Sequence, residues 1–266
     1  MRTIESLDLS SYRTLVCGGS QGIGKGCALA LGEAGASVTV LARDERALRA
    51  AVDELTTHGG RSHAYLVADF ADPASVARVV ETFVKETGPV QVLLNNTGGP
   101  PSGSLSDSSA DQLRLAFQAH VQTAQLLVRA LVEGMKQSHF GRIINIISTS
   151  VLQPIRGLGV SNTIRGAMAN WGRTLAGELA PFGITVNNIL PGYVATERLR
   201  SLLTERAQRL GVSYEQVEQT IVAAIPAGRL GTPGDIGRVV AFLASPAAEY
   251  VNGVNLPVDG GRTAIQ

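Results

Sequence analysis

Short apolar runs alternate with longer amphipathic stretches along the chain, and this alternation restricts the possible folds more than any other feature. Runs such as Arg13–Cys17 and Ser37–Ala42 predict buried strands, and the stretches between them have the length and periodicity of helices. Strands separated by helices must pair in parallel, because each crossover returns the chain to the same end of the sheet. The sequence therefore predicts an α/β fold with an open, doubly wound sheet, helices on both faces, and ligands at the carboxyl ends of the strands.

Seven strands and six helices follow from this pattern. The predicted strands are Arg13–Cys17, Ser37–Ala42, Ser62–Ala68, Val90–Leu94, Arg142–Ile147, Ile184–Ile189 and Val254–Val258. The predicted helices are Ile23–Glu33, Glu45–Thr56, Ala74–Glu86, a long helix that ends near Gln137, Val160–Leu179 and Asp235–Leu243. A charged helical stretch, Glu197–Ile221, interrupts the rhythm before the last helix.

Size and composition fit one domain that spans residues 1–266. The chain has a mass of 27.8 kDa and is 44% hydrophobic and 17% charged, which suffices for a buried parallel sheet covered by helices. Its net charge of +1 gives no strong field that would attract nucleic acid or a membrane. No apolar run reaches the roughly 18 residues that a membrane-spanning helix needs.

The amino-terminal segment and the cysteines predict a cytoplasmic protein. Met1–Ser10 is polar and lacks the apolar centre of a signal peptide. Cys17 and Cys27 cannot form a disulfide framework, and their predicted places, at a strand end and in a helix, indicate small core residues. We predict no metal site.

The loop after the first strand predicts a nucleotide site. Gly18–Gly24 follows a strand and opens a helix, and its glycines allow a tight turn and a close approach to a pyrophosphate. The N–H groups and the dipole of the helix N-terminus then favour the anion. The alternative is a strand-to-helix turn without a ligand.

Five motifs in this order resemble the short-chain dehydrogenase/reductase family. They are Gly18-x-x-x-Gly22-x-Gly24, Asp69, Asn95-Asn96-Thr97-Gly98, Pro191-Gly192 with Thr196, and Val258-Asp259-Gly260-Gly261. The resemblance runs from about Tyr12 to Gly261 and implies a Rossmann-type, seven-stranded sheet of order 3-2-1-4-5-6-7. The cofactor contacts that it implies are Gly18, Ser20, Gln21, Gly22, Ile23, Gly24, Arg43, Asp69, Asn95, Gly98, Arg165, Pro191, Gly192 and Thr196.

The end of the second strand favours NADP(H) over NAD(H). NAD-selective members of the family hold the ribose hydroxyls with an acidic side chain at this point, but here Ala42 is followed by Arg43. The planar guanidinium of Arg43 would bind the 2′-phosphate of NADPH. The alternative is an arginine that pairs with Asp44 or Glu45.

The catalytic positions depart from the family pattern. The family uses Ser, Tyr, Lys and an upstream Asn. Ser148 matches the serine, whereas Ser161, Arg165 and His120 stand at the positions of the other three. Ser161 and Arg165 share a helix face, as Tyr and Lys would, which favours a coordinated change of chemistry over random loss. Arg165 would hold the cofactor ribose and stabilise an oxyanion.

Three residues are candidates for supplying the proton that the missing tyrosine would donate. Ser161 is a weak acid, and His120 would suit a relay because a free imidazole titrates near pH 6.5. The alternative for His120 is a hydrogen-bonded histidine inside a helix pair. Tyr193 would lie near the nicotinamide, and its alternative is a packing residue or a wall of the substrate pocket.

Residues 191–225 are predicted to form a substrate-binding lid over the carboxyl ends of the strands. Its apolar side is expected to comprise Leu199, Leu202, Leu203, Leu210 and Val217, and its basic side Arg198, Arg200, Arg206 and Arg209. The basic side would receive an acidic substrate or a phosphopantetheine arm, or it would simply be solvated.

These observations lead to an oxidoreductase hypothesis with a binding module as its alternative. Gly98–Pro101, Ser161–Arg165 and Pro191–Arg198 resemble a β-ketoacyl-acyl-carrier-protein-reductase-like subgroup that lacks a full catalytic set. This resemblance implies a small carbonyl or acyl-thioester substrate, reduced with NADPH. An inert NADPH-binding sensor or scaffold would keep the same motifs, and so would a non-redox enzyme that stabilises an anion. The family also implies a homotetramer or homodimer, and the predicted helical segments Leu113–Met135 and Val160–Leu179 carry apolar residues on more than one face.

Overall fold

The computed structural model describes residues 7–58 and 62–265. The prediction that Met1–Ser10 is not a signal peptide therefore falls largely outside the described residues. Seven parallel strands form a sheet of order β3-β2-β1-β4-β5-β6-β7, as the sequence predicts. They are β1 (Arg13–Cys17), β2 (Ser37–Ala42), β3 (Ala64–Val67), β4 (Val92–Asn95), β5 (Gly141–Ile146), β6 (Ile184–Pro191) and β7 (Asn255–Val258).

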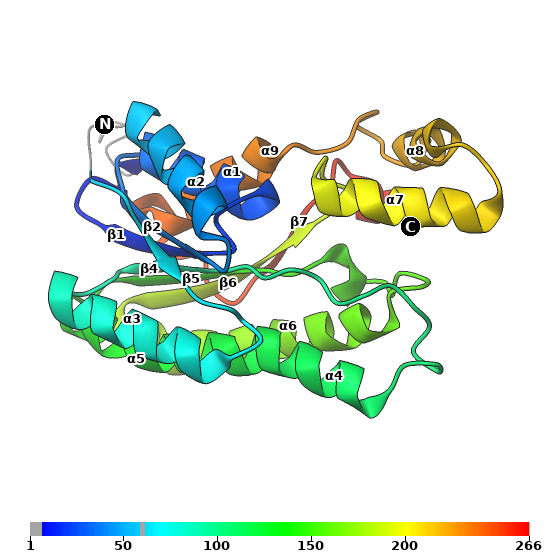
Figure 1. Ribbon diagram of the computed structural model, residues 1–266. Coiled ribbons are helices and arrows are strands. Elements are labelled where there is room, and N and C mark those ends of the chain that lie inside the picture. Colours follow the sequence, from blue (N-terminus) through cyan, green and yellow to red (C-terminus); the bar gives the residue numbers. More distant parts are fainter. Residues whose placement is uncertain (1–6, 59–61, 266) are drawn as a thin grey trace.

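Helices cover both faces of the sheet (Figure 1). On one face lie α1 (Gly22–Glu33), α2 (Glu45–His58) and α9 (Pro233–Ala244); on the other lie α3 (Pro73–Thr87), α4 (Ala110–Phe117), α5 (Thr123–Gln137) and α6 (Gly159–Leu179). Strands β4, β5 and β6 are buried along their whole length, and polar residues such as Arg142, Asn145 and Asn188 are buried with their apolar neighbours. Cys17 and Cys27 are fully buried in the two core layers, as expected, and burial raises the pKa of the Cys17 thiol to about 12.

The helix predicted to end near Gln137 is divided by a π-helical turn, Gln118–Gln122, between α4 and α5. The hydroxyl of Thr123 donates to the carbonyl oxygen of Gln118, five residues earlier, over 3.0 Å and so supports the wider turn. Such single turns within α-helices are frequent at functional sites. This one carries His120, whose side chain points into the molecule.

Asparagine side chains form a hydrogen-bonded row across four neighbouring strands. Asn95, Asn145, Asn188 and Asn255 lie opposite one another in the register of β4, β5, β6 and β7. Their amides are joined in sequence by hydrogen bonds of 2.9, 2.8 and 2.8 Å. The row satisfies polar groups that would otherwise be buried without partners beneath α6.

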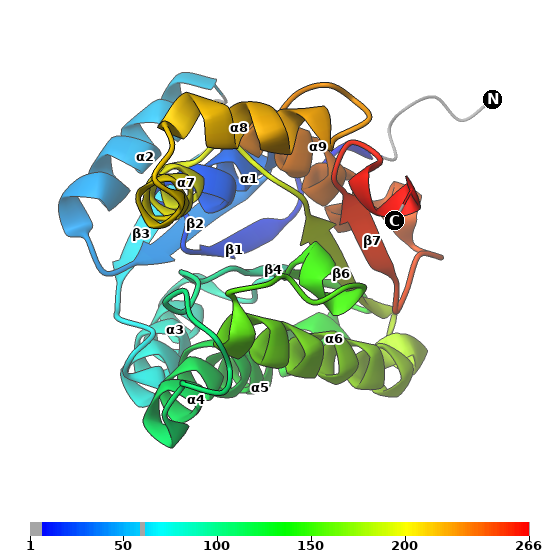
Figure 2. The same cartoon turned by 90° about the vertical axis from the view of Figure 1, so that its right-hand side faces the viewer.

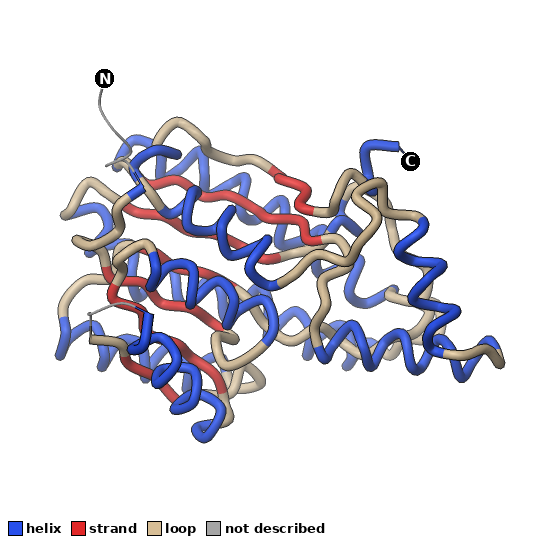
Figure 3. The backbone as a smooth tube through the Cα atoms, turned by 90° about the horizontal axis from the view of Figure 1, so that it is seen from above, coloured by secondary structure: helices blue, strands red, loops and turns tan. Residues whose placement is uncertain are grey.

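A pair of helices, α7 (Glu197–Leu210) and α8 (Tyr214–Ala223), lies beyond the carboxyl ends of the strands (Figures 2 and 3). The charged stretch predicted as helical is thus broken at Gly211, which has a left-handed φ of 66°. Leu199, Leu203 and Val217 are buried between the two helices as expected, but Leu210 is 56% exposed, so its assignment to the apolar side was wrong. Within the described ranges, no helix combines the length and apolar character needed to cross a bilayer.

Candidate functional site

The glycine loop between β1 and α1 has the backbone geometry that its glycines allow. Gly18 and Gly22 have φ values of 59° and 55°, which other residues rarely adopt. A Cβ atom on Gly24 would lie 2.1 Å from the carbonyl oxygen of Gly18. Each of the three glycines is therefore required by the local fold.

The N-terminus of α1 has free capacity for an anion. Its N-cap residue, Gln21, is extended and makes no capping hydrogen bond through its side chain, and the first turn carries no acidic residue. By contrast, the N-terminus of α3 is capped by the carboxylate of Asp72 over 3.0 Å. Thr196, the N-cap of α7, faces the loop, since a Cβ on Gly22 would lie 3.4 Å from its methyl group. Ser20 and Ile23 beside this opening are half-buried.

Arg43 is exposed directly after β2, and its guanidinium takes part in no ion pair with the described residues. The acidic neighbours that offered the alternative have other partners. Asp44 accepts a hydrogen bond from the backbone of Ala47, and Glu45 pairs with Arg49. After β3, the carboxylate of Asp69 is exposed and accepts from the N–H of Ala71 over 2.9 Å.

The two asparagines after β4 have different roles. Asn95 is 7% exposed, and its Nδ2 donates to Oδ1 of Asn145, so this part of its amide is engaged within the sheet. Asn96, which the sequence motif contains but our site prediction omitted, donates to the carbonyl oxygens of Cys17 and Gly18 over 3.2 and 3.4 Å. It therefore ties the β4 loop to the glycine loop. A Cβ on Gly98 would meet no atom within 4 Å, so space is open there.

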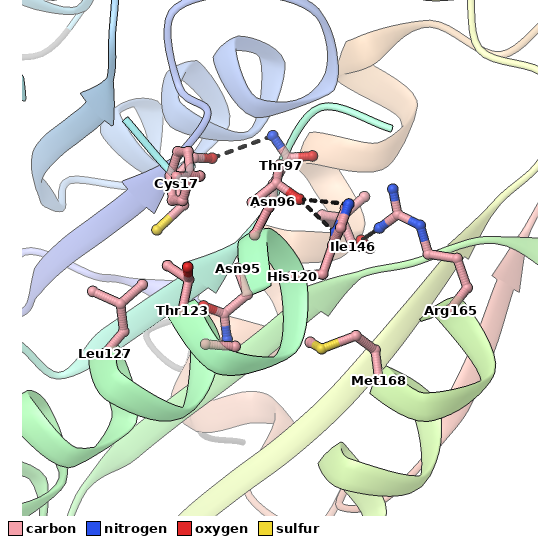
Figure 4. A pocket seen from close by; sticks show the side chains of 13 residues that line it. Cys17, Asn95, Asn96, Thr97, His120, Thr123, Leu127, Ile146, Arg165 and Met168 are labelled. Atoms are coloured by element: carbon pink, nitrogen blue, oxygen red, sulfur yellow. Dashed lines mark hydrogen bonds between the residues drawn. The ribbon is translucent and has the colours of Figure 1, made fainter. Parts of the chain in front are cut away.

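A small cavity beneath this loop brings together several predicted site residues (Figure 4). Its volume is about 10 Å³, close to the least that holds one water molecule. The polar side chains that line it come from four elements of the fold: Asn95, Asn96, Thr97, His120, Thr123 and Arg165. The hydroxyl oxygen of Thr97 lies 2.6 Å from Nδ1 of His120.

The charges at this cavity are set by burial and by neighbouring cations. His120 is 6% exposed, and its pKa is lowered to about 3 by burial and by the positive charge of Arg165. The imidazole is therefore neutral at physiological pH, which favours the hydrogen-bonded alternative over a relay that passes through imidazolium. Burial and the charge of Arg198 lower the pKa of Arg165 to about 10, so this side chain remains a cation at neutral pH.

Arg165, Ser148 and Ser161 are the next predicted catalytic residues. Nη1 of Arg165 donates to the carbonyl oxygen of Ile146 over 2.9 Å, at the end of the strand that leads to Ser148. The hydroxyl of Ser148 is half-buried and accepts from the N–H of Ser150. Ser161 lies one turn before Arg165 on α6 and is also half-buried.

Tyr193 occupies a packing position after β6. Its ring packs against the cluster between α7 and α8, with the guanidinium of Arg262 4.9 Å from its centroid. Before it, Pro191 is the last residue of β6. A Cβ on Gly192 would lie 2.6 Å from Cβ of Asp259, which accounts for the glycine.

Sequence comparisons decide the family. A profile described as enoyl-(acyl carrier protein) reductase matches residues 18–263. The short-chain reductase protein NovJ of Streptomyces niveus is 35% identical over 251 residues, which cover 93% of this chain and 92% of that protein. This chain belongs to the short-chain dehydrogenase/reductase family.

Other members of the short-chain dehydrogenase/reductase family agree in sequence and structure. The 3-oxoacyl-[acyl-carrier-protein] reductase of Escherichia coli K12 is 34% identical over 253 residues, 94% of this chain and 97% of that protein. The crystal structure of L-sorbose reductase from Gluconobacter frateurii, complexed with NADPH and L-sorbose, has a TM-score of 0.91 at 28% identity and covers 97% of this chain and 98% of its own.

In this short-chain dehydrogenase/reductase, the loop after β4 contacts both α7 and the segment before α6. Nη2 of Arg198 on α7 donates to the carbonyl oxygen of Pro100 over 2.6 Å. The hydroxyl of Ser102 donates to Glu205 of the same helix over 2.7 Å. Gly103 also forms a parallel bridge with Leu158, just before α6. The loop after β4 is thus hydrogen-bonded on both sides of the site, and no prediction from sequence included these contacts.

Proposed function

We propose that this chain is an NADP(H)-dependent oxidoreductase that interconverts a carbonyl and an alcohol. The observation that carries the proposal is the uncapped N-terminus of α1, which faces Thr196, together with the open space at Gly98 in the loop after β4. Such a terminus suits a pyrophosphate, and the open space suits the nicotinamide half of a dinucleotide. In support, the NADPH-dependent reductase BacG of Bacillus subtilis is 28% identical over 254 residues.

The residues that would hold the cofactor lie in the loops that follow β1, β2, β3, β4 and β6. The loop Gly18–Gly24 and Thr196 would bind the pyrophosphate, and Asp69 and the backbone around Asn95 would border the adenine and the ribose. Arg43 would bind the 2′-phosphate, since it has no ion-pair partner among the residues that the structure describes. This unpaired guanidinium is why we propose NADP(H) rather than NAD(H).

Arg165 would take the place of the family's lysine and would also stabilise the reacting oxygen. A nicotinamide cofactor held by these residues would supply the hydride, and negative charge would develop on the carbonyl oxygen of the substrate. The cation of Arg165 and the hydroxyl of Ser148 would stabilise this oxygen. Ser161, on the same face of α6, would pass a proton from solvent. His120, whose imidazole is neutral, would position Arg165 and Thr97. Tyr193 would form a wall of the pocket.

Residues 191–225 would act as the lid of a single domain that spans residues 1–266. The helices α7 and α8 have their own buried cluster, which suits a segment that moves as a unit. We also propose a cytoplasmic homotetramer or homodimer. Exposed Leu115 and Phe117 on α4 support burial of that surface between subunits. Two of the relatives are 3-oxoacyl-[acyl-carrier-protein] reductases. An acyl thioester is therefore a substrate to test alongside small ketones.

A second function is favoured by one observation. Tyr193 packs against the α7–α8 cluster, and the family position of the catalytic tyrosine carries Ser161. Loss of a positioned general acid costs roughly 10²–10⁴ in rate. A chain that gained nothing in exchange would be an inert NADPH-binding sensor or scaffold.

Turnover separates the two functions. NADPH oxidation is measured across ketones and 3-oxoacyl thioesters for the wild type and for the double variant Ser161→Tyr, Arg165→Lys, with NADPH binding measured on both. Wild-type turnover at least equal to that of the double variant supports the proposed enzyme. Turnover by the double variant alone, with equal NADPH binding, overturns it and supports the binding module.

A further inference from the structure

Two arginines from different helices border the loop that follows β4. Arg165 of α6 lines the cavity beside Thr97 and His120, and its guanidinium lies next to the imidazole (Figure 4). Arg198 of α7 donates to the carbonyl oxygen of Pro100, and a Cβ on Gly99 would lie 3.6 Å from its Nη2 atom. Gly98 follows Thr97 and precedes Gly99 in the chain, and a Cβ there would meet no atom within 4 Å.

Neither guanidinium is neutralised by the protein. Both donate to backbone carbonyls, and neither forms an ion pair with any carboxylate in residues 7–58 and 62–265. The two cations also repel each other, since the charge of Arg198 acts to lower the pKa of Arg165. Arg165 is half-buried and Arg198 is exposed, so the cost in free energy falls chiefly on the Arg165 cation, and a bound anion would reduce it.

The proposed pyrophosphate site does not include Arg165. It lies at Gly22 and Thr196, and neither of these residues lines the cavity that Arg165 borders. Arg198 follows Thr196 by two residues, and its guanidinium donates to the carbonyl oxygen of Pro100. Arg198 and Arg200 are both exposed, but only Arg198 donates to this loop; among the described residues, no hydrogen bond joins the side chain of Arg200 to it.

We propose that Arg165 and Arg198 together bind an anionic group, a carboxylate or a phosphate, on the carbonyl substrate. This inference rests on the proposed oxidoreductase function and names its substrate class: oxo acids or phosphorylated ketones. Guanidinium groups bind both carboxylates and phosphates through paired hydrogen bonds. The two arginines therefore indicate a negatively charged group, and the experiment below distinguishes a carboxylate from a phosphate.

Matched substrate pairs test the proposal. Acetoacetate is compared with methyl acetoacetate, and dihydroxyacetone phosphate with dihydroxyacetone, by NADPH oxidation with wild type, Arg198→Gln and Arg200→Gln. We expect one charged member to have a KM lower than its neutral partner by about tenfold or more, the size of a charge-assisted contact. Arg198→Gln should abolish this difference, and Arg200→Gln should retain it.

Calorimetric binding of the same four compounds to the NADP⁺-loaded protein separates this inference from the proposed function. Binding of a charged compound that depends on Arg198, without turnover, supports the anion site and contradicts the oxidoreductase. Turnover with equal KM for charged and neutral members keeps the oxidoreductase and overturns the anion site. Absence of both binding and turnover for the charged compounds also overturns it. So does an Arg198→Gln variant that loses NADPH affinity as strongly as anion affinity, because the cofactor would then be the anion.

Discussion

Nδ2 of Asn145 donates to Oδ1 of Asn188 across 2.8 Å, and both side chains are almost fully buried. The pair lies between β5 and β6, directly beneath Gly172 of α6. A Cβ on Gly172 would lie 2.6 Å from Oδ1 of Asn188 and 2.9 Å from Nδ2 of Asn145. The hydrogen-bonded row and the close approach of α6 therefore depend on each other, and α6 is the helix that carries Arg165.

The contact predicts that Gly172→Ala destabilises the protein. The added methyl group must displace α6 or break the asparagine pair, and overpacking of this kind costs about 1–3 kcal/mol. Gly177 on the same helix is a matched control, because a Cβ there would meet nothing within 4 Å. Gly177→Ala should be neutral or stabilising by up to about 1 kcal/mol, through helix propensity. Urea unfolding of both variants tests this, and equal effects would contradict the packing argument.

The strands and their parallel pairing were predictable because apolar runs and glycine punctuation are local signals, whereas the order of the strands came from the resemblance to the family. The boundaries of β1 and β2 agree with those predicted, and the other strands differ by a few residues. The π-helical turn was not predictable, because it depends on a hydrogen bond between Thr123 and Gln118 that competes with ordinary helical bonding. The exposure of Leu210 likewise depends on where Gly211 ends α7, which apolar periodicity does not specify.

The candidate site was predictable where a motif determines the backbone conformation. It was not predictable where a side chain has several possible hydrogen-bond partners. The glycine loop and Thr196 lie together as their motifs indicate. The sequence does not reveal that the amide of Asn95 is engaged within the sheet while that of Asn96 ties two loops together. Nor does it give the contact of Arg198 with Pro100, which joins residues 98 positions apart.

The burial of His120 predicts a specific dependence of stability on pH. Its pKa is about 3 in the folded protein and near 6.5 in an unfolded chain, so the unfolded state binds more protons between these values. This group's contribution is therefore complete above pH 6.5 and is lost as pH falls towards 3, by at most about 1.4 kcal/mol per pH unit. His120→Asn should flatten the slope of unfolding free energy against pH in this window.

His139 provides the control for that measurement. It is exposed, and asparagine tolerates its left-handed φ of 48°. His139→Asn should retain the wild-type slope between pH 4 and 6.5. A His120→Asn variant with an unchanged slope would show that the imidazole is not held neutral in the folded protein.

The open space at Gly98 predicts a variant that separates cofactor binding from folding. Ala at this position meets no atom of the protein within 4 Å, so the unfolding free energy of Gly98→Ala should stay within about 0.5 kcal/mol of wild type. If the nicotinamide half of NADPH fills this space, the methyl group should raise its Kd by about tenfold or more. Fluorescence titration with NADPH measures this, and unchanged affinity would place the cofactor elsewhere.

The unpaired guanidinium of Arg43 predicts the choice between the two nicotinamide cofactors. Arg43→Gln removes the charge but keeps hydrogen-bonding capacity, and the loss of a charge-assisted contact should raise the Kd of NADPH by about 10- to 100-fold. NADH lacks the 2′-phosphate, so its Kd should change by less than about twofold. Arg46→Gln, at an exposed position on α2, should leave both values unchanged. Because the site is exposed, added salt should weaken NADPH binding more in wild type than in Arg43→Gln. Equal losses for NADH and NADPH would contradict a phosphate contact and assign Arg43 to the structure of the β2–α2 turn instead.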